Sequence, residues 1–478
     1  MNTTKSSKKN KGPEKTAVAA DLRRIITAQR ELYASGQTRD IAFRRQLLIN
    51  LKIMIRDNEE LILDALRADL GKSHREGYIT EIGIVEQELN HTLRNLRLWN
   101  SPKLTRTPFY MLPAASYKLR HPRGLVMIFS SWNYPFQLAI MPLIASIAAG
   151  NCTILKLSEN APNTSKLLCE LIGRYFDREC VAAYMDSFEA IKAIKREQFG
   201  MIFYTGGPAV ARIVAKAAAD KLTPVVLELG GKSPCIVDKT ANLRLAAKRI
   251  VAGKLINAGQ TCVAPDYLFV ESSVKDELLG YIKEYHDKFC TEDPCENGFY
   301  PKIVNRMHFD RLRSYLADGD ILMGGEANED TGRISLTLME RIDKDSKLMS
   351  EEIFGPILPI FEFTDIDAVI STLSKRPKSL ALYLFTNSKS TRAAVLGGLD
   401  FGCGCVNDTV MQTANPHLPF GGIGESGIGK YHGKAGFNTF TTESSVLKSS
   451  SYFDLNPLRY PPFDDFYSFS KILLRYFT

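Results

Sequence analysis

Several features that would assign this chain to a special class are missing from its sequence. No apolar run reaches the ~18 residues that a membrane-spanning helix needs, and the N-terminus lacks the apolar core of a secretory signal. The nine cysteines are irregularly spaced, which argues against a disulfide framework. None of the seven histidines lies in a metal-like pair, and Cys403-Gly-Cys405 has no matching second pair, so we interpret it as a strand end. These absences predict a cytoplasmic protein with no metal.

The excess of basic residues lies largely at the N-terminus. The chain of 478 residues has a net charge of +8, with 45% hydrophobic and 24% charged residues. Residues 1–15 hold five lysines and one glutamate, a net +4, and almost nothing apolar, so we interpret them as a disordered basic tail. The remaining charge is nearly balanced and is not clustered, which disfavours nucleic-acid binding. The length predicts two or three globular domains.

The order of apolar patterns predicts a helical N-terminal region followed by alternating strands and helices. Residues 17–99 carry apolar residues at helical spacing, and we expect helices at 17–35, 38–56, 59–70 and 73–99. Short apolar runs then predict strands at 125–129, 152–156, 181–185, 201–204 and 225–227, with helices between them. This alternation is typical of βαβ units in a parallel sheet. Ligands bind at the carboxyl ends of such strands.

Polar residues gather where these strands end. Asn133 follows the first strand, Lys156 and Glu159 follow the second, and Thr205-Gly206-Gly207 leads into a helix that begins with Pro208. A glycine turn that opens a helix presents free N–H groups to an anion. The G-x-G-x-x-G fingerprint of dinucleotide-binding folds is absent. The turn by itself therefore fits either a phosphate site or an ordinary strand-helix connection.

One cysteine and one glutamate are the candidates for covalent chemistry. Cys262 lies in a Gly-Gln-Thr-Cys turn after a helical run at 243–257, and Glu228 ends the apolar strand at 225–227 and enters a Gly-Gly turn. A thiolate nucleophile with a neighbouring base can attack a carbonyl carbon. The residue types alone leave two alternatives open, because most cysteines are core residues and a carboxylate at a strand end is often a cap.

Two motifs resemble the signature of the aldehyde dehydrogenase superfamily. They are Leu227-Glu-Leu-Gly-Gly-Lys-Ser-Pro234 and Asn257-Ala-Gly-Gln-Thr-Cys262, and Cys262 follows Glu228 by 34 residues. Further segments resemble the class 3 branch, which acts on fatty and aromatic aldehydes: Ser131-Trp-Asn-Tyr-Pro135, Cys262-Val-Ala-Pro-Asp-Tyr267, Tyr431-His-Gly433 and Arg459-Tyr-Pro-Pro462. The resemblance extends from about residue 38 to about residue 462.

The resemblance implies a homodimer whose subunits have an α/β fold in three parts. The three parts are a modified Rossmann NAD(P)-binding domain, an α/β catalytic domain and a small β oligomerisation arm. We assign residues 16–107 and 123–227 to the first, 228–429 to the second, and 108–122 and 430–450 to bridging strands. Residues 451–478 form a C-terminal tail whose tyrosines, phenylalanines and basic residues could contact a membrane surface, cover the substrate mouth or meet a partner.

The resemblance also implies a role for each site residue. Asn133 and the Cys262 backbone N–H would hold an oxyanion, and Glu228 would activate water. Lys156 and Glu159 would bind the adenosine ribose, and Thr205-Gly206-Gly207 the cofactor phosphates. Glu352 would contact the nicotinamide ribose and Phe354 the nicotinamide. Gly207, Leu157 and Ala211 stand where the family usually has Ser, Pro and Gly. We therefore expect the geometry of cofactor binding to differ from the family's usual pattern.

The expected reaction is the oxidation of an aldehyde to a carboxylic acid through a Cys262 thiohemiacetal and thioester. Medium- or long-chain aliphatic or aromatic aldehydes are the expected substrates. Glu159 favours NAD, with NADP as the alternative, because a carboxylate repels a ribose 2′-phosphate. Two other functions stay open: an acylating reductase of the same fold, which Glu228 argues against, and a binding protein, which the combination of Cys262, Glu228 and Asn133 argues against.

Overall fold

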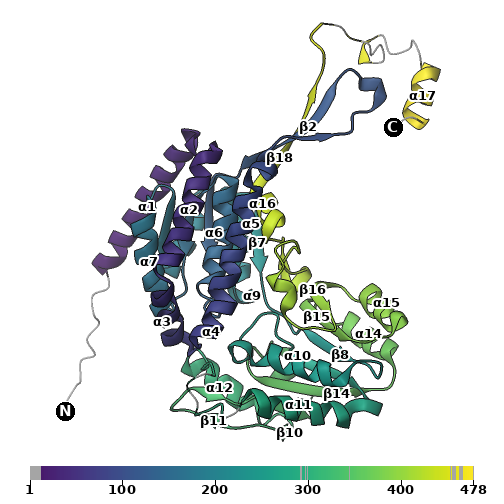
Figure 1. Ribbon diagram of the computed structural model, residues 1–478. Helices are drawn as coiled ribbons and strands as arrows, with labels where there is room; N and C mark the ends of the chain where they lie inside the picture. The colour runs from purple at the N-terminus through teal and green to yellow at the C-terminus, as the bar shows by residue number, and fades with distance from the viewer. Residues whose placement is uncertain are drawn as a thin grey trace, which may run out of the picture.

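The computed structural model describes residues 12–290, 293–296, 298, 300–343, 345–452, 454, 459–461 and 467–476. The described strands form a six-stranded sheet, a seven-stranded sheet, a three-stranded arm and a two-stranded ribbon of β11 (Ala327–Asn328) and β12 (Arg333–Ile334). In Figure 1 the six-stranded sheet and its helices form the upper body, the seven-stranded sheet the lower body, and the arm projects from the top.

The six-stranded sheet contains the five parallel strands expected from the sequence. Its order is β17 (Gly427–Ile428), β7 (Val225–Glu228), β6 (Met201–Thr205), β3 (Leu125–Phe129), β4 (Cys152–Lys156) and β5 (Val181–Tyr184). Strands β3 to β7 pair in parallel and β17 runs antiparallel to β7. The strand order reverses at β3, between β4 and β6, and this reversal is where such folds bind their ligands.

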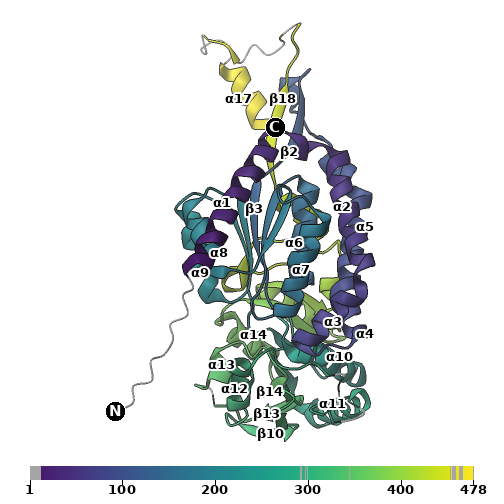
Figure 2. The ribbon, with the colours of Figure 1, turned by 90° about the vertical axis from the view of Figure 1, so that its left-hand side faces the viewer.

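Helices cover both faces of this sheet, which explains its continuous apolar strands. The helices α1 (Gly12–Ala34), α8 (Ser187–Arg196) and α9 (Pro208–Ala219) lie on one face. On the other lie α2 (Ile41–Asp57), α5 (Gly83–Asn100), α6 (Gln137–Ala149) and α7 (Pro162–Tyr175), with α3 (Glu59–Leu70) packed on α7 (Figure 2). Strand residues alternate between faces: Met127 packs towards α1 and Ile128 towards α6.

Two expectations for the N-terminal region are wrong in part. The tail was expected to be disordered through residue 15, but α1 begins at Gly12, and residues 1–11 lie outside the described part. Proline has no backbone N–H, and the first N–H groups of a helix have no acceptor within it, so Pro13 is compatible with the first turn of α1. The single helix expected at 73–99 is instead α4 (His74–Gly77), a π-helical turn η2 (Tyr78–Ile82) and α5.

The seven-stranded sheet is also largely parallel. Its order is β10 (Asp320–Met323), β13 (Thr337–Glu340), β14 (Ile357–Phe363), β9 (Tyr267–Glu271), β8 (Pro234–Val237), β15 (Ser379–Phe385) and β16 (Phe401–Val406), and only the β10–β13 pair is antiparallel. Helices α10 (Leu243–Leu255) and α11 (Lys275–Phe289) cover one face, and α14 (Ile366–Ser374) and α15 (Lys389–Gly398) the other. Helices α12 (Arg306–Tyr315) and α13 (Lys347–Ser350) pack beside β13 and β14.

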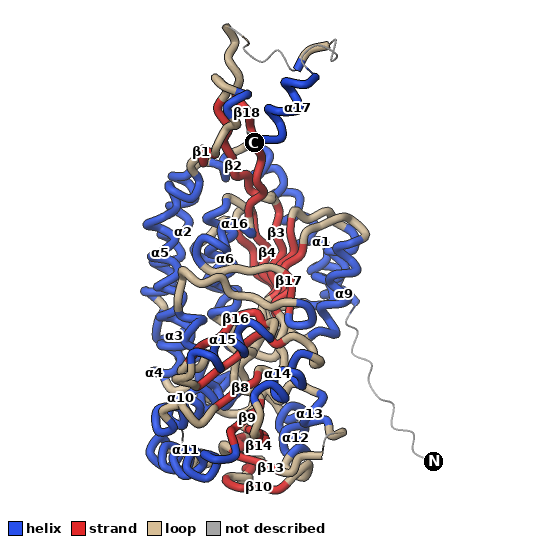
Figure 3. The backbone as a smooth tube through the Cα atoms, turned by 90° about the vertical axis from the view of Figure 1, so that its right-hand side faces the viewer, coloured by secondary structure: helices blue, strands red, loops and turns tan. Residues whose placement is uncertain are grey.

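The arm consists of β1 (Lys103–Thr105), β2 (Ala115–Pro122) and β18 (Thr441–Lys448) in antiparallel pairs. A short turn of 3-10 helix, Phe109–Met111, lies between β1 and β2. Figure 3 shows β2 and β18 leaving the body together. Within the segment 430–450, α16 (Gly433–Thr439) comes before β18 and packs on α5 and α6.

The C-terminal segment contains a helix that the sequence analysis did not predict, α17 (Tyr467–Tyr476). Residue 462 of the class 3 segment at 459–462 lies outside the described residues. Within the described ranges, no helix combines the length and the apolar character needed to cross a bilayer.

Candidate active site

A cavity of about 270 Å³ lies at the carboxyl ends of β3, β6 and β7. We call it the polar cavity. Eight of the ten predicted site residues line it: Asn133, Thr205, Gly206, Gly207, Glu228, Cys262, Glu352 and Phe354. They come from both large sheets, because β7 belongs to the six-stranded sheet while Glu352 and Phe354 precede β14 of the seven-stranded one. The parallel strands end at one edge, which brings together residues far apart in sequence.

Glu228 is a buried carboxyl next to the nucleophile candidate. It is the last residue of β7 and only 2% of its surface is exposed. Burial raises the pKa of Glu228 to about 7, and the nearby side chains of Cys262 and Thr205 oppose this rise. Its Oε1 atom has no hydrogen-bond partner among the residues that the structure describes. A carboxyl with a pKa near neutrality can accept and release a proton at working pH.

Cys262 is the last residue of an irregular turn that begins with η4 (Ile256–Gly259) and continues through residues 260–262. We call residues 256–262 the thiol turn. Asn257 and Ala258 have left-handed backbone angles, with φ of 52° and 51°. Gly259 also has a positive φ of 70°, and a Cβ there would lie 2.3 Å from the Gly355 carbonyl oxygen. The Gln260 side chain closes the turn by donating to the Asn257 carbonyl at 3.0 Å. Gly259 is therefore required by its positive φ and by the nearby Gly355 carbonyl, and the Gln260 amide stabilises the turn.

Cys262 is half-buried and lines two cavities. Besides the polar cavity, it lines one of about 320 Å³ whose wall is mostly apolar; we call this the apolar cavity. Its lining includes Ile79, Ile84, Leu138, Val263, Val410, Met411, Phe420 and Tyr431. Burial raises the pKa of the Cys262 thiol well above its ordinary value, and the carboxyls of Glu228 and Glu352 add to the rise. The resting thiol is therefore protonated, and a base must take its proton before it can attack.

Asn133 belongs to the amide loop, residues 130–136, which joins β3 to α6. Its side chain is buried and its Nδ2 atom donates to the Gln260 carbonyl at 3.2 Å. Its own carbonyl accepts from Asn257 Nδ2 at 2.8 Å. The amide loop and the thiol turn are thus joined at two points, and the Asn133 amide lines the same cavity as the thiol.

Glu352 and Phe354 lie on the opposite wall of the polar cavity. Burial raises the pKa of Glu352 to about 8, with Asp266 as the next cause. A Cβ added at Gly230 would lie 1.9 Å from the Glu352 carboxylate, so only glycine lets this carboxylate approach the β7–β8 turn. Phe354 has a left-handed φ of 50° and packs edge-on against Trp132, with ring centroids 5.3 Å apart.

Lys156 and Glu159 are placed at the same sheet edge but outside the polar cavity. Lys156 ends β4 and is paired in register with Phe129 of β3. Its Nζ atom lies 2.6 Å from Glu159 Oε2, and Glu159 Oε1 accepts from the Ser187 backbone N–H and hydroxyl at 2.9 and 2.6 Å. Burial alone would raise the pKa of Glu159, but these hydrogen bonds lower it. This carboxylate is therefore charged and fixed in place.

Several residues that line the polar cavity were not predicted as site residues, and three of them are aromatic or charged side chains near the predicted ones. Trp132, His308 and Arg311 also line the polar cavity. The His308 ring lies 5.1 Å from the Trp132 ring, and Arg311 donates to the Ile353 carbonyl at 2.8 Å. The spacing of His308 and Arg311 on one helix face was visible, but nothing local in the sequence distinguishes this face of α12 from an ordinary packing face.

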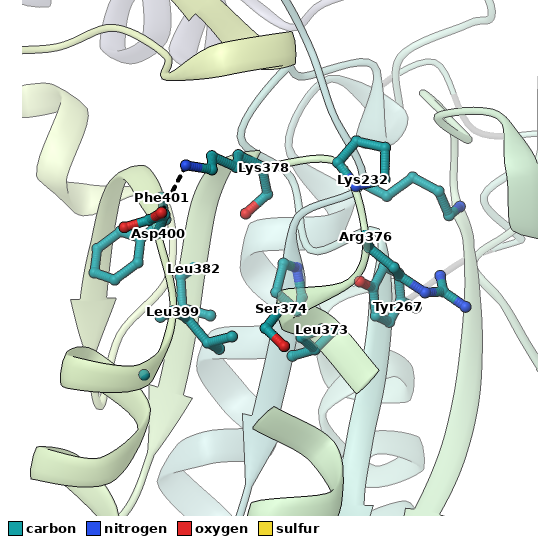
Figure 4. Close-up of a pocket in the computed structure, with 14 residues that line it drawn as sticks. Lys232, Tyr267, Leu373, Ser374, Arg376, Lys378, Leu382, Leu399, Asp400 and Phe401 are labelled. Carbon is teal, nitrogen blue, oxygen red and sulfur yellow. Dashed lines mark ion pairs between the residues drawn. The ribbon is translucent and has the colours of Figure 1, made fainter. Parts of the chain in front are cut away.

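A smaller cleft of about 80 Å³ lies where β8, β9, β15 and β16 begin, and it contains none of the predicted site residues. Figure 4 shows Lys378 directed at Asp400, with which it forms an ion pair at 2.6 Å, and Arg376 beside Tyr267. Lys232 is paired with Asp266, so each charged group of the cleft already has its own neighbour. The polar and apolar cavities remain the place for chemistry.

The fold and the two cavities are those of an α/β enzyme with a binding site at the carboxyl ends of parallel strands. Comparison with known proteins specifies the family. The sequence profile of the aldehyde dehydrogenase family matches residues 5–446. The 4,4'-diaponeurosporen-aldehyde dehydrogenase of Staphylococcus aureus is 42% identical over 445 residues, 93% of this chain and 97% of that protein. Aldehyde dehydrogenase family 3 member A2 of Macaca fascicularis is 39% identical, over 92% of this chain and 91% of its own.

The solved structures agree with this assignment. The substrate-bound Staphylococcus aureus AldH has a TM-score of 0.92 and 41% identity, covering 95% of this chain and 99% of that one. This chain belongs to the aldehyde dehydrogenase family, and family 3 members are among its relatives. It is an oxidoreductase that oxidises aldehydes to carboxylic acids with NAD(P). The predicted family, fold class, activity and cofactor are confirmed.

Proposed function

We propose that this enzyme oxidises medium- or long-chain aliphatic or aromatic aldehydes, with Cys262 as nucleophile, Glu228 as base and Asn133 as oxyanion donor. The observation that carries the proposal is the position of Cys262. It stands where the polar cavity at the carboxyl ends of the parallel strands meets the apolar cavity, beside a buried carboxyl. A cofactor in the first cavity and an aldehyde in the second would both reach the same sulfur.

The first half of the reaction uses the thiol and the amide. Glu228 takes the proton of Cys262, and the thiolate sulfur forms a bond to the aldehyde carbon. The aldehyde oxygen becomes negatively charged and accepts hydrogen bonds from Asn133 Nδ2 and the Cys262 backbone N–H. The Nδ2 group has two hydrogens, so it can donate one to this oxygen and keep the other on the Gln260 carbonyl, a bond of 3.2 Å in the present structure. The nicotinamide, when bound, supplies the acceptor for the hydride that the carbon loses.

The second half returns the enzyme to its starting state. The carbon is now a thioester carbonyl on Cys262. Glu228 first releases the proton of Cys262 to solvent and then takes a proton from a water molecule that attacks this carbon. The C–S bond breaks, the acid leaves, and the thiol recovers its proton. The pKa of about 7 lets one carboxyl serve both transfers. An acylating reductase would need no such base, so Glu228 favours hydrolysis over that alternative.

The residues at the sheet edge fit a dinucleotide. Gly206 and Gly207 open α9 towards the polar cavity, and free N–H groups at a helix start suit phosphates. Val210 and Ile213 leave apolar surface exposed on α9, which suits the flat face of an adenine ring. Glu159 stays charged and tied to Lys156 and Ser187, so it would bind a ribose 2′-hydroxyl and repel a 2′-phosphate. We therefore propose NAD as the preferred cofactor.

Three further proposals concern the whole molecule. The arm exposes Leu104, Leu112 and Leu447, which supports a homodimer joined through β1, β2 and β18; light scattering coupled to gel filtration measures its mass. The catalytic thiol needs a reducing compartment, which supports the cytoplasm. Membrane-surface contact by the C-terminal segment is the weaker proposal, supported by exposed Tyr467 and Ile472 on α17.

The test is NADH formation, followed by absorbance, with aldehydes from hexanal to hexadecanal and with benzaldehyde. Cys262→Ala should abolish turnover, while Cys169→Ala, which removes a half-buried thiol on α7, should leave it unchanged. A rise in kcat/KM with chain length would support the apolar cavity as the substrate site. If the wild type oxidises none of these aldehydes with NAD or NADP, the proposed substrates are wrong.

A further inference from the structure

Three charged residues of one short segment, Lys72, Glu76 and Glu81, contact the amide loop and the thiol turn. The segment runs from the end of α3 through α4 and the π-helical turn η2. Neither the sequence patterns nor the reaction above assigns these residues a role. Their contacts reach the residues on either side of the attacking sulfur.

Lys72 and Glu81 form an ion pair that is closed off from solvent. Their Nζ and Oε1 atoms lie 2.6 Å apart, and both side chains are 0% exposed. Glu81 Oε2 accepts from the backbone N–H groups of Phe136 and Gln137 at 2.9 and 3.1 Å, which fixes the start of α6. Lys72 Nζ also donates to the Asn133 carbonyl at 3.2 Å and lies 4.0 Å from the centre of the Tyr134 ring. The pair therefore holds the amide loop at three successive points.

Glu76 makes the corresponding contact with the thiol turn. Its Oε1 atom accepts from the Asn257 backbone N–H at 2.7 Å. Asn257 is one of the two residues in left-handed conformation, and its side chain donates to the Asn133 carbonyl. A further link joins the Tyr134 and Thr261 hydroxyls at 2.5 Å. The Asn133 carbonyl thus receives one donor from Lys72 and one from the thiol turn, and both bonds hold the backbone from which the Asn133 amide extends.

Packing alone is a poor explanation for this arrangement. Burying two charges is costly even when they are paired, and apolar residues of similar volume often serve stability as well or better. Glu81 lies in a π-helical turn, a rare element that is frequent at functional sites. The same turn contributes Ile79 and Thr80 to the wall of the apolar cavity. The segment therefore contacts the amide loop and the thiol turn and also forms part of the wall of the apolar cavity.

We propose that Lys72, Glu76 and Glu81 are positioning residues that hold the Asn133 amide at the oxyanion site beside Cys262. The inference rests on the proposed function, since it gives Asn133 its role in the reaction. None of the three touches the substrate carbon; they act through the amide loop and the thiol turn. The expected consequence of their loss is a slower reaction with cofactor binding retained.

The main test is the double variant Lys72→Met/Glu81→Gln. Glutamine can still accept from the Phe136 and Gln137 N–H groups, so the start of α6 is kept, while the donor to the Asn133 carbonyl is lost. We expect kcat to fall by about 10- to 100-fold, because a misplacement of about 1 Å costs about that much. The dissociation constant of NAD, measured by fluorescence quenching, should stay within about threefold of the wild-type value. The midpoint of thermal unfolding should stay close to that of the control Lys275→Met, which loses ion pairs to Glu340 and Glu362 instead.

A double-mutant cycle with Asn133→Ala separates positioning from general damage. Asn133→Ala alone should cost about 10²- to 10³-fold in kcat. If the pair acts through Asn133, adding Asn133→Ala to the double variant should leave kcat within about threefold of Asn133→Ala alone. Losses that multiply, or a wild-type kcat in the folded double variant, would overturn the proposal.

Amide hydrogen exchange gives a result that does not depend on turnover. Residues 130–136 and 256–262 should exchange faster in the double variant than in the wild type or in Lys275→Met, and unchanged exchange would count against the proposal. Should the double variant fail to fold, Glu76→Ala tests the contact with Asn257 by the same two measurements. If the wild type oxidises no aldehyde, the proposed function fails, and the exchange data still decide whether the segment holds the two loops.

Discussion

Replacing Glu228 by glutamine should make the protein more stable at alkaline pH while removing its activity. The pKa of Glu228 is raised from 4.5 to about 7, with burial as the main cause. This difference of about 2.5 (7 less 4.5) corresponds to about 3 kcal/mol at 1.36 kcal/mol for each pH unit. The folded state binds this proton more tightly than the unfolded state, so the wild type loses that stability as pH rises from 4.5 through 7. Glutamine resembles the protonated form at every pH.

The assay is the free energy of unfolding at pH 5 and pH 8.5 for wild type and Glu228→Gln. At pH 5 the two proteins should differ by less than about 1 kcal/mol, and at pH 8.5 the variant should be more stable by about 2–3 kcal/mol. Steady-state turnover of the variant should fall by about 10²- to 10⁴-fold, because the water that attacks the thioester has lost its base.

A matched control is Glu189→Gln, which replaces a buried carboxyl that keeps an ion pair with Lys192 at 2.8 Å. This variant should gain no stability at pH 8.5, because Lys192 balances the charge of the wild-type carboxylate. The reasoning is refuted if Glu228→Gln shows no gain at pH 8.5, or the same gain at both pH values. Either result would mean that the folded protein does not raise the pKa of this carboxyl.

Four further outcomes follow from the site. Gly230→Ala should destabilise the protein by about 1–3 kcal/mol and weaken NAD binding, because its Cβ would lie 1.9 Å from the Glu352 carboxylate; thermal unfolding and fluorescence titration measure both effects. Glu159→Gln should raise kcat/KM with NADP relative to NAD by about tenfold, the effect of removing about 1.4 kcal/mol of repulsion. Ile84→Trp should shorten the longest aldehyde accepted, because Ile84 lines the apolar cavity; an unchanged chain-length profile would place the substrate elsewhere. The rate of thioester hydrolysis should increase with pH through an inflection near 7, the pKa of Glu228, and a flat profile from pH 5.5 to 8.5 would exclude this residue as the base.

Much of the first sheet could be predicted because its signals are local. The strands β3 and β4 were predicted at their observed bounds, since a strand covered on both faces is a continuous apolar run. The glycine and amide residues around Cys262 were visible as a motif, and the structure explains them by left-handed backbone angles at Asn257 and Ala258. Asn133, Thr205 and Glu228 lie at or after strand ends, so their clustering in the polar cavity also follows from the parallel order of the strands.

Other features depend on contacts between distant residues. The strands β10, β13 and β14 were not predicted, and the helix expected at 73–99 hides the π-helical turn that carries Glu81. The Asn257 side chain and the Asn133 carbonyl that it contacts are 124 positions apart. No periodicity in the sequence records such a contact.

The sequence by itself determined the parallel sheet, the candidate nucleophile and base, and the order in which they occur, because apolar periodicity and turn residues act between near neighbours. Only the tertiary structure decided that Cys262 opens to two cavities, that Glu228 has a pKa near 7 and that a buried lysine supports Asn133. Burial, electrostatic environment and hydrogen bonding at the site arise when segments from both large sheets pack together. A residue's neighbours along the chain do not specify the charges and dipoles that surround it after folding.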